Sequence, residues 1–368
     1  MSATGDSLLQ VKNLRVHFET EDGIVKAVDG VSFDVQPGRT LGIVGESGSG
    51  KSVANLTILG LTRAPNARIS GEILFDGEDL ASAAPERMRQ VRGNDIAMIF
   101  QDPLSSLHPF YKVGTQLVEA VRAHRDVPQS QARQRAVELL GLVGIPEAAR
   151  RVDDYPHEFS GGMRQRVMIA MALVNDPKLL IADEPTTALD VTTQAQILVL
   201  IDRLQREFGM AVILITHDLG VVAENADEIA VMYAGRIVER APARTIFAAP
   251  QHPYTWGLLR SIPRISAADE REEELVPIPG TPPSLITVPS GCSFHPRCPY
   301  ARPRHREVDP PLERVDAEHE VACLLSTETR AALWAELRAG ADPVEAVAAV
   351  GLSDTVVAPP AAATGERR

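Results

Sequence analysis

Residues 45–52 carry the groups that phosphate binding requires. They read Gly-Glu-Ser-Gly-Ser-Gly-Lys-Ser, which fits the spacing G-x-x-x-x-G-K-[ST] of a phosphate-binding loop, or P-loop. Glycine lets the backbone N–H groups approach phosphate oxygens closely, the lysine supplies a charge for the β- and γ-phosphates, and the last serine offers a hydroxyl to Mg²⁺. The sequence therefore predicts a site for a nucleoside triphosphate and Mg²⁺, made by Gly45, Glu46, Ser47, Gly48, Ser49, Gly50, Lys51 and Ser52.

Two carboxylates and a histidine could supply the remaining chemistry. Asp183 and Glu184 directly follow the apolar residues 179–182. We expect Asp183 to hold Mg²⁺, through water, and Glu184 to act as general base toward an attacking water. His217 follows a second apolar run, 210–216, and is predicted to lie near the γ-phosphate. A solvated strand end and a helix cap are the ordinary alternatives, and the preceding phosphate loop favours the catalytic interpretation.

The elements needed to position these residues can be identified from periodicity. The apolar residues 40–44 lead into the glycine loop and residues 52–61 form a helical pattern, which is the context that a phosphate loop requires and a chance glycine turn lacks. Strands at 178–182 and 210–216 enclose a helix at 193–208, so the sheet should be parallel there. Residues 7–36 alternate with the period of antiparallel strands, and apolar residues recur at helical spacing in segments 113–124, 129–143 and 161–174. The predicted fold class is α/β: a mixed sheet with helices, a β-rich antiparallel N-terminal part and an inserted helical subdomain at about 95–175.

Composition limits the partners and the compartment. The 368 residues suffice for two or three domains. A net charge of −12 argues against a nucleic-acid partner. There is no run of about 18 apolar residues, so no membrane-spanning segment is expected, nor does the N-terminus resemble a secretion signal. The three cysteines all follow residue 291 and do not form a disulfide framework, which favours a reducing cytoplasm.

The C-terminal third has a different character. Residues 250–289 are rich in proline, residues 291–325 hold every cysteine, and a short helix is predicted at 328–338. Residues 353–368 have the composition of a disordered tail. We therefore expect a nucleotide-binding domain at 7–249, a small loop-rich module at 250–325, and a helix with a tail at 326–368.

Taken together, these motifs resemble the ATP-binding-cassette (ABC) ATPase family over residues 8–250. The resemblance implies that Gln101 senses the γ-phosphate and Mg²⁺ and links the site to membrane subunits. It implies that Ser160, Gly161 and Gly162 contact ATP held by a second cassette, and that Asp190 lies in a loop crossing the dimer interface. Phe18 is the candidate for stacking on adenine, with a core role as the alternative. The chain would then form half of an ATP sandwich.

A narrower resemblance covers residues 8–325. Segments 159–173, 250–255 and 278–285 are similar to the ATPases of oligopeptide, dipeptide and nickel importers. This implies ATP hydrolysis that energises peptide import at the cytoplasmic face of the membrane. The implied partners are a second homologous ATPase subunit in a heterodimer, two transmembrane permease subunits that dock at 102–111, and, indirectly, an extracytoplasmic solute-binding protein. Import of nickel or another small solute, a soluble ATPase acting on nucleic acid or ribosomes, and a binding-only cassette are the alternatives.

The cysteine segment resembles a part of the same subfamily in which four cysteines occur. The corresponding set here is Cys292, Cys298, His305 and Cys323. The resemblance implies a [4Fe–4S] cluster, in which histidine can replace a cysteine ligand. Structural zinc and free thiols remain open as alternatives, and His295 and His319 are alternative nitrogen ligands.

Overall fold

The computed structural model describes residues 7–101, 106–186, 189–262 and 277–352. Its main sheet has eight strands in the order β11-β12-β10-β9-β3-β8-β7-β6. The neighbours from β9 to β6 are all parallel, and β10 joins β9 antiparallel. The strands of this part are β3 (Thr40–Val44), β6 (Ile96–Ile99), β7 (Leu179–Asp183), β8 (Ala211–Thr216), β9 (Glu228–Tyr233) and β10 (Arg236–Pro242). Every residue of β3, β7 and β8 is buried, as expected where helices or a second sheet cover both faces.

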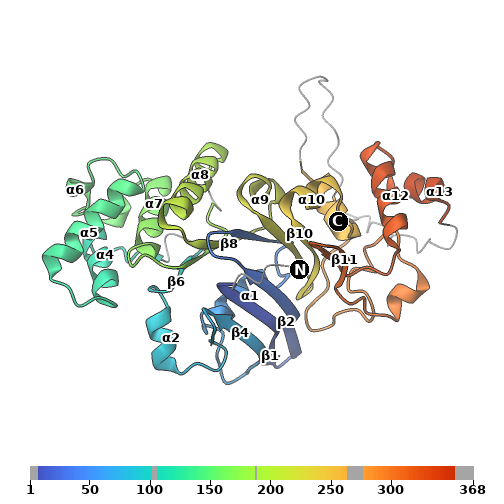
Figure 1. Ribbon diagram of the computed structural model, residues 1–368, viewed down its shortest axis with the longest axis horizontal. Helices are drawn as coiled ribbons and strands as arrows, with labels where there is room; N and C mark the ends of the chain where they lie inside the picture. Colours follow the sequence, from blue (N-terminus) through green and yellow to red (C-terminus); the bar gives the residue numbers. More distant parts are fainter. Residues whose placement is uncertain (1–6, 102–105, 187–188, 263–276, 353–368) are drawn as a thin grey trace, which may run out of the picture.

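The second sheet is antiparallel and four-stranded, in the order β2-β1-β4-β5. It lies below the main sheet in Figure 1, with α1 beside it. Its strands are β1 (Leu9–Thr20), β2 (Gly23–Val35), β4 (Ala67–Phe75) and β5 (Glu78–Asp79). Its inward side chains, such as Leu9 and Leu14, share one core with Ile43 of β3 and Ile58 of α1 (Lys51–Ile58). The predicted β-rich, antiparallel opening is thus confirmed, and its sheet packs against the helix that follows the phosphate loop.

A group of helices occupies the end of the molecule drawn in green (Figure 1). Helices α4, α5 and α7 pack together there through the buried Leu117, Leu139 and Ile169. Besides α1, the helices of the described residues up to 248 are α2 (Pro85–Val91), α4 (Val113–Arg122), α5 (Gln129–Leu142), α6 (Ala148–Arg151), η1 (Pro156–Glu158), α7 (Gly161–Ala172), α8 (Val191–Phe208), α9 (Leu219–Asn225) and α10 (Ala243–Ala248). The predicted inserted helical region is therefore present.

The C-terminal module, by which we mean the described residues 250–262 and 277–352, extends the main sheet. Strand β12 pairs antiparallel with β10, Glu239 opposite Val321. The fully buried Glu239 accepts hydrogen bonds from the N–H groups of Gln251 and His252 and contacts His319 Nε2 at 2.8 Å. The elements are α11 (Pro253–Arg260), η2 (Pro303–Arg306), β11 (Glu313–Asp316), β12 (His319–Val321), α12 (Thr327–Arg338) and α13 (Pro343–Val350).

Two further expectations concern this half. The helix predicted at 328–338 corresponds to α12, whereas the tail predicted to be disordered lies outside the described residues. Among the residues described, no helix is both long enough and apolar enough to cross a bilayer. The division of the chain near residue 249 stays a prediction.

Candidate functional site

The predicted phosphate loop opens onto a cleft of about 780 Å³, which is of the size that ligand sites usually have. The cleft lies where β6, β7 and β8 end. It is lined by the loop and by Gln101, Glu184 and His217, which follow these three strands. Phe18, Val25 and Leu285 line it as well. Residues far apart in the sequence meet here because parallel strands end at one edge of the sheet.

The conformation of the loop is fixed by contacts within the loop and with strand β9. Gly50 has φ +101 at the start of α1, a conformation that other residues resist. A Cβ on Gly45 would lie 2.1 Å from the carbonyl oxygen of Met232, so this position has no room for a side chain. Lys51 is buried, and its Nζ donates to the carbonyl oxygens of Gly45 and Glu46 at 2.6 and 2.9 Å. Burial lowers the pKa of Lys51, and the negative charges of Glu184, Asp183 and Glu46 oppose this.

Ser52 and Asp183 form the pair expected at a magnesium site. The Ser52 hydroxyl donates to Asp183 Oδ1 at 3.1 Å. Burial raises the pKa of Asp183, although the hydrogen bond from Ser52 lowers it. A hydroxyl and a carboxylate beside a phosphate loop are the oxygen ligands that Mg²⁺ prefers, so the residues present fit this ion.

Glu184 lies between two polar side chains. Gln101 Nε2 donates to Glu184 Oε2 at 2.9 Å, and His217 Nδ1 lies 3.3 Å from Glu184 Oε1. The backbone of Glu184 has φ +46, an uncommon conformation for glutamate, and its N–H donates to the Ile215 carbonyl at 2.9 Å. The carboxylate is thus oriented from both sides at the edge of the cleft.

The residues expected to contact a second cassette lie elsewhere. Ser160 caps α7, where its hydroxyl accepts from the Met163 N–H at 3.3 Å, and Asp190 caps α8 by accepting from the Thr193 N–H at 3.0 Å. Ser160, Gly161 and Asp190 are exposed, and none of them, nor Gly162, is among the described residues that line the cleft. Residues 102–105 of the expected docking segment lie outside the described parts of the chain.

The expected metal site of the cysteine segment gains no support. Cys292, Cys298 and Cys323 lie near enough that a negative charge on one thiol would raise the pKa of another, but among the described residues no three His, Cys, Asp or Glu side chains gather closely enough to hold a metal ion. His305 Nδ1 instead accepts from the Arg302 N–H at 3.0 Å. In the structure as it stands, burial raises the pKa of Cys292 to about 12.

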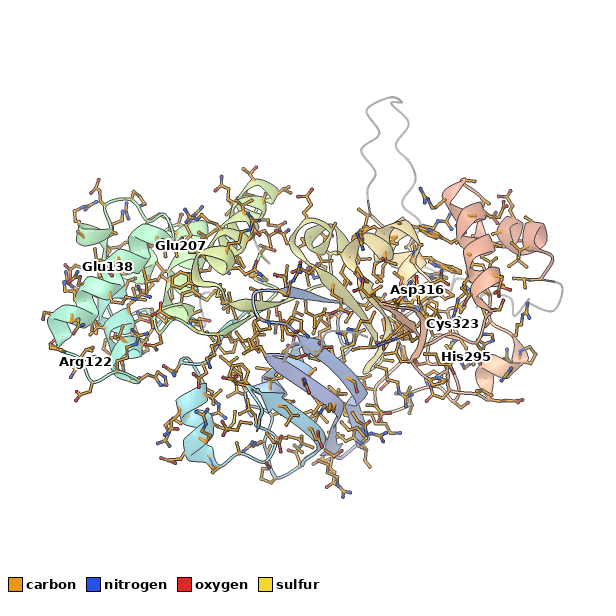
Figure 2. The ribbon with its side chains drawn as sticks, viewed as in Figure 1. Arg122, Glu138, Glu207, His295, Asp316 and Cys323 are labelled. Atoms are coloured by element: carbon orange, nitrogen blue, oxygen red, sulfur yellow. The ribbon has the colours of Figure 1, made fainter. Side chains whose placement is uncertain are left out.

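The alternative histidines are also engaged elsewhere. His295 Nδ1 lies 2.9 Å from the Cys292 carbonyl oxygen, and His319 contacts Glu239. Both His295 and Cys323 lie in the C-terminal module (Figure 2). As they are arranged here, the residues proposed as ligands do not fit an iron–sulfur cluster or a zinc ion.

Sequence reasoning missed three residues that reach the site from the C-terminal module. Arg297 and Tyr254 bond to Glu46, and Leu285 lines the cleft. The segments that carry them were recognised as motifs, but no local pattern shows that they meet the phosphate loop.

Comparison with known proteins extends these observations. Residues 28–187 match the ABC transporter family, and residues 238–304 match the oligopeptide/dipeptide transporter C-terminal region. The oligopeptide transport ATP-binding protein OppD of Bacillus subtilis is 54% identical over 85% of this chain and 87% of its own length. OppD of Escherichia coli is 50% identical over 88% of this chain and 94% of its own length.

Solved structures show the same cassette. A dimeric ATP-binding cassette in a post-hydrolysis state, bound to ADP and Pi, is 28% identical with a TM-score of 0.57, over 64% of this chain and 99% of that one. CbiO1 from Clostridium perfringens, part of the ABC transporter complex cbiONQ, is 30% identical with a TM-score of 0.56, over 66% and 92% of the two chains.

Proposed function

Because this chain belongs to the ABC transporter family of ATP-binding proteins, we propose that it hydrolyses ATP to energise the import of oligopeptides across a membrane. The observation that carries the enzymatic part is the position of Glu184, held by Gln101 and His217 at the mouth of the phosphate-loop cleft. The peptide substrate is supported by the match of residues 238–304 and by the relatives that share about half of their residues with this chain.

The contacts and the family resemblance support a role for each residue of the cleft. The loop amides and Lys51 would bind the phosphates, and Ser52, Asp183 and Gln101 would hold the Mg²⁺ that accompanies ATP. Bound there, the ion would neutralise charge on the phosphates and so favour transfer of the γ-phosphoryl group to water. Glu184 accepts the proton of the attacking water, and His217 orients Glu184 and contacts the γ-phosphate. Phe18 stacks on the adenine ring. No step depends on the three cysteines.

A second cassette would complete the site. Ser160, Gly161, Gly162 and Asp190 do not line the cleft of their own chain, which supports a role in contacting ATP held by a homologous ATPase subunit. The proposed assembly adds two transmembrane permease subunits, and a solute-binding protein outside the membrane delivers the peptide. This chain would lie at the cytoplasmic face, where ATP is available. ATP binds from both sides only in the closed state, so it favours closure, and hydrolysis releases it.

The test is transport in a defined system. The chain is reconstituted in liposomes with its permease and ATPase partners and the solute-binding protein, and uptake of a labelled pentapeptide is measured with and without ATP inside. We expect uptake that requires ATP and is lost in Lys51→Ala. Uptake of nickel but not of peptides would contradict the proposed substrate, and peptide uptake that persists in Lys51→Ala would contradict the proposed ATPase role.

A further inference from the structure

The C-terminal module bonds directly to the phosphate loop of its own chain. Glu46, the second residue of the loop, receives two hydrogen bonds from one guanidinium group. Arg297 Nη1 lies 2.6 Å from Glu46 Oε2, and Nη2 lies 2.9 Å from Oε1. Such two-point pairing fixes both the distance and the orientation of the carboxylate.

Arg297 is itself held rigidly. Its side chain is only 5% exposed, Nε donates to the Pro279 carbonyl oxygen at 2.9 Å, and the guanidinium carbon lies 5.8 Å from the ring centre of Tyr233. These contacts come from two separate parts of the chain, the proline-rich segment after residue 277 and strand β9 of the core. A guanidinium fixed in this way can restrain the loop that it bonds.

A second residue of the module holds the backbone at the same position. The Glu46 N–H donates to the Tyr254 hydroxyl at 2.8 Å. Tyr254 is fully buried and packs against Tyr233 and Phe294, with ring centres 4.6 and 5.4 Å away. Both the main chain and the side chain of Glu46 are thus bonded to residues that follow position 250.

The module also contributes a residue to the lining of the cleft. Leu285 lines it together with Phe18 and Val25, and the Lys26 N–H donates to the Leu285 carbonyl oxygen at 2.9 Å. The module therefore lines the cleft at Leu285 and bonds to another lining residue, Glu46.

The charge of Glu46 gives this contact a consequence for binding. A carboxylate in a loop that must bind a polyanion repels it, and that repulsion is weakened when a guanidinium neutralises the carboxylate. We propose that Arg297 is a positioning residue for ATP, acting through Glu46, so that the C-terminal module completes the nucleotide site. This inference rests on the proposed function and assigns to the module a part in nucleotide binding.

The test measures ATP·Mg²⁺ binding to the full chain by titration calorimetry. We expect Arg297→Met to raise the Kd about tenfold, within the usual range of coupling between sites, because the Glu46 carboxylate then faces the phosphates without a counter-charge. In the Glu46→Gln background the same replacement should change the Kd less than about twofold. Arg297→Lys keeps the charge but not the two-point geometry, and should fall between the wild type and Arg297→Met.

Asp309→Asn is the matched control. Asp309 belongs to the module and pairs with Arg236 of β10. Removing its charge weakens an ion pair between the module and the core that does not involve the phosphate loop. The Kd should stay at the wild-type value. Thermal unfolding of each variant shows that it is folded, and if Arg297→Met does not fold, Arg297→Lys with and without Glu46→Gln forms the same cycle.

Three outcomes would overturn the inference: an unchanged Kd in folded Arg297→Met, an equal rise in both Glu46 backgrounds, or an equal rise in Asp309→Asn. In the first two cases Arg297 does not act through Glu46. In the third case ATP binding depends on how firmly the module is attached to the core, and not on the contact between Arg297 and Glu46. A wild-type chain that binds no ATP would instead refute the proposed function, so the two failures are distinguishable.

Discussion

Replacing Glu184 by glutamine should remove catalysis while preserving nucleotide binding. The amide has nearly the shape of the carboxylate, and its oxygen can still accept the hydrogen bond from Gln101 Nε2 that is now 2.9 Å long. The atoms proposed to bind phosphate and Mg²⁺, on Lys51, Ser52 and Asp183, are untouched. What is lost is the proton acceptor beside the cleft.

The magnitude follows from this difference. A positioned general base contributes about 10²- to 10⁴-fold to the rate, or about 2.7–5.4 kcal/mol of activation free energy. The structural cost is far smaller, because the replacement changes mainly one contact, the 3.3 Å approach of His217 Nδ1, and a single hydrogen bond is worth about 1 kcal/mol. Removing a negative charge beside the phosphates should tighten ATP binding slightly.

The assay is phosphate release by the assembled transporter at saturating ATP, paired with ATP binding to the isolated chain. Glu184→Gln should lower kcat at least a hundredfold while the Kd for ATP does not rise. Glu138→Gln is the control, since Glu138 is an exposed residue of α5 away from the cleft (Figure 2). Turnover within about twofold of the wild type in Glu184→Gln would refute the assignment of the base.

Three further predictions concern the surroundings of the site. Gly50→Ala should destabilise the fold by about 3 kcal/mol or more and abolish ATP binding. The reason is that φ is +101 at this position and the new Cβ would lie 2.2 Å from the Ala27 carbonyl oxygen. A melting temperature equal to that of the wild type would contradict this. Burial, aided by the charge of Arg330, lowers the pKa of His252 to about 3. Between pH 6.5 and 3, therefore, only the unfolded state takes up the proton. The free energy of unfolding should decrease as the pH decreases, by about 2 kcal/mol at pH 5. Urea unfolding at pH 7 and pH 5 should show this loss, and His252→Asn, which can keep the helix cap, should remove it; an equal loss in the variant would refute the assignment. Leu285→Ala should weaken ATP binding about fivefold, because an apolar contact worth about 1 kcal/mol is lost. Binding of tripolyphosphate, which has no adenine ring, should stay unchanged. Equal losses for both ligands would argue against a contact between Leu285 and adenine.

The phosphate loop and its strand and helix could be predicted because their signals are local. Even there the helix expected to run to residue 61 ends at Ile58, since Gly60 adopts φ +63, a common way to end a helix. The contact between Gln101 and Glu184 depends on β6 lying beside β7, an order of strands that periodicity alone does not give. The family resemblance implied a role for each residue separately, whereas their contact appears only in the folded chain.

The C-terminal module was the hardest part to foresee. Its motifs are recognisable, yet the bond between Arg297 and Glu46 joins residues 251 positions apart, and no pattern on either segment encodes that partner. The cysteine segment shows a different limit. Resemblance implied a metal site for Cys292, Cys298, His305 and Cys323, but a ligand set requires convergent side chains, and among the described residues no three His, Cys, Asp or Glu side chains gather closely enough to hold a metal ion.

The same 251-residue separation imposes an order of events during biosynthesis. At the usual 5–20 residues per second, Arg297 is added about 13–50 s after Glu46, and it leaves the ribosome later still. A nascent chain can therefore form the phosphate loop, the four-stranded sheet and the main-sheet strands up to β10 long before the guanidinium that neutralises Glu46 exists. If the loop binds ATP poorly until then, a newly made cassette cannot bind ATP well until translation is almost finished. Chains truncated before Arg297 would then hydrolyse little ATP.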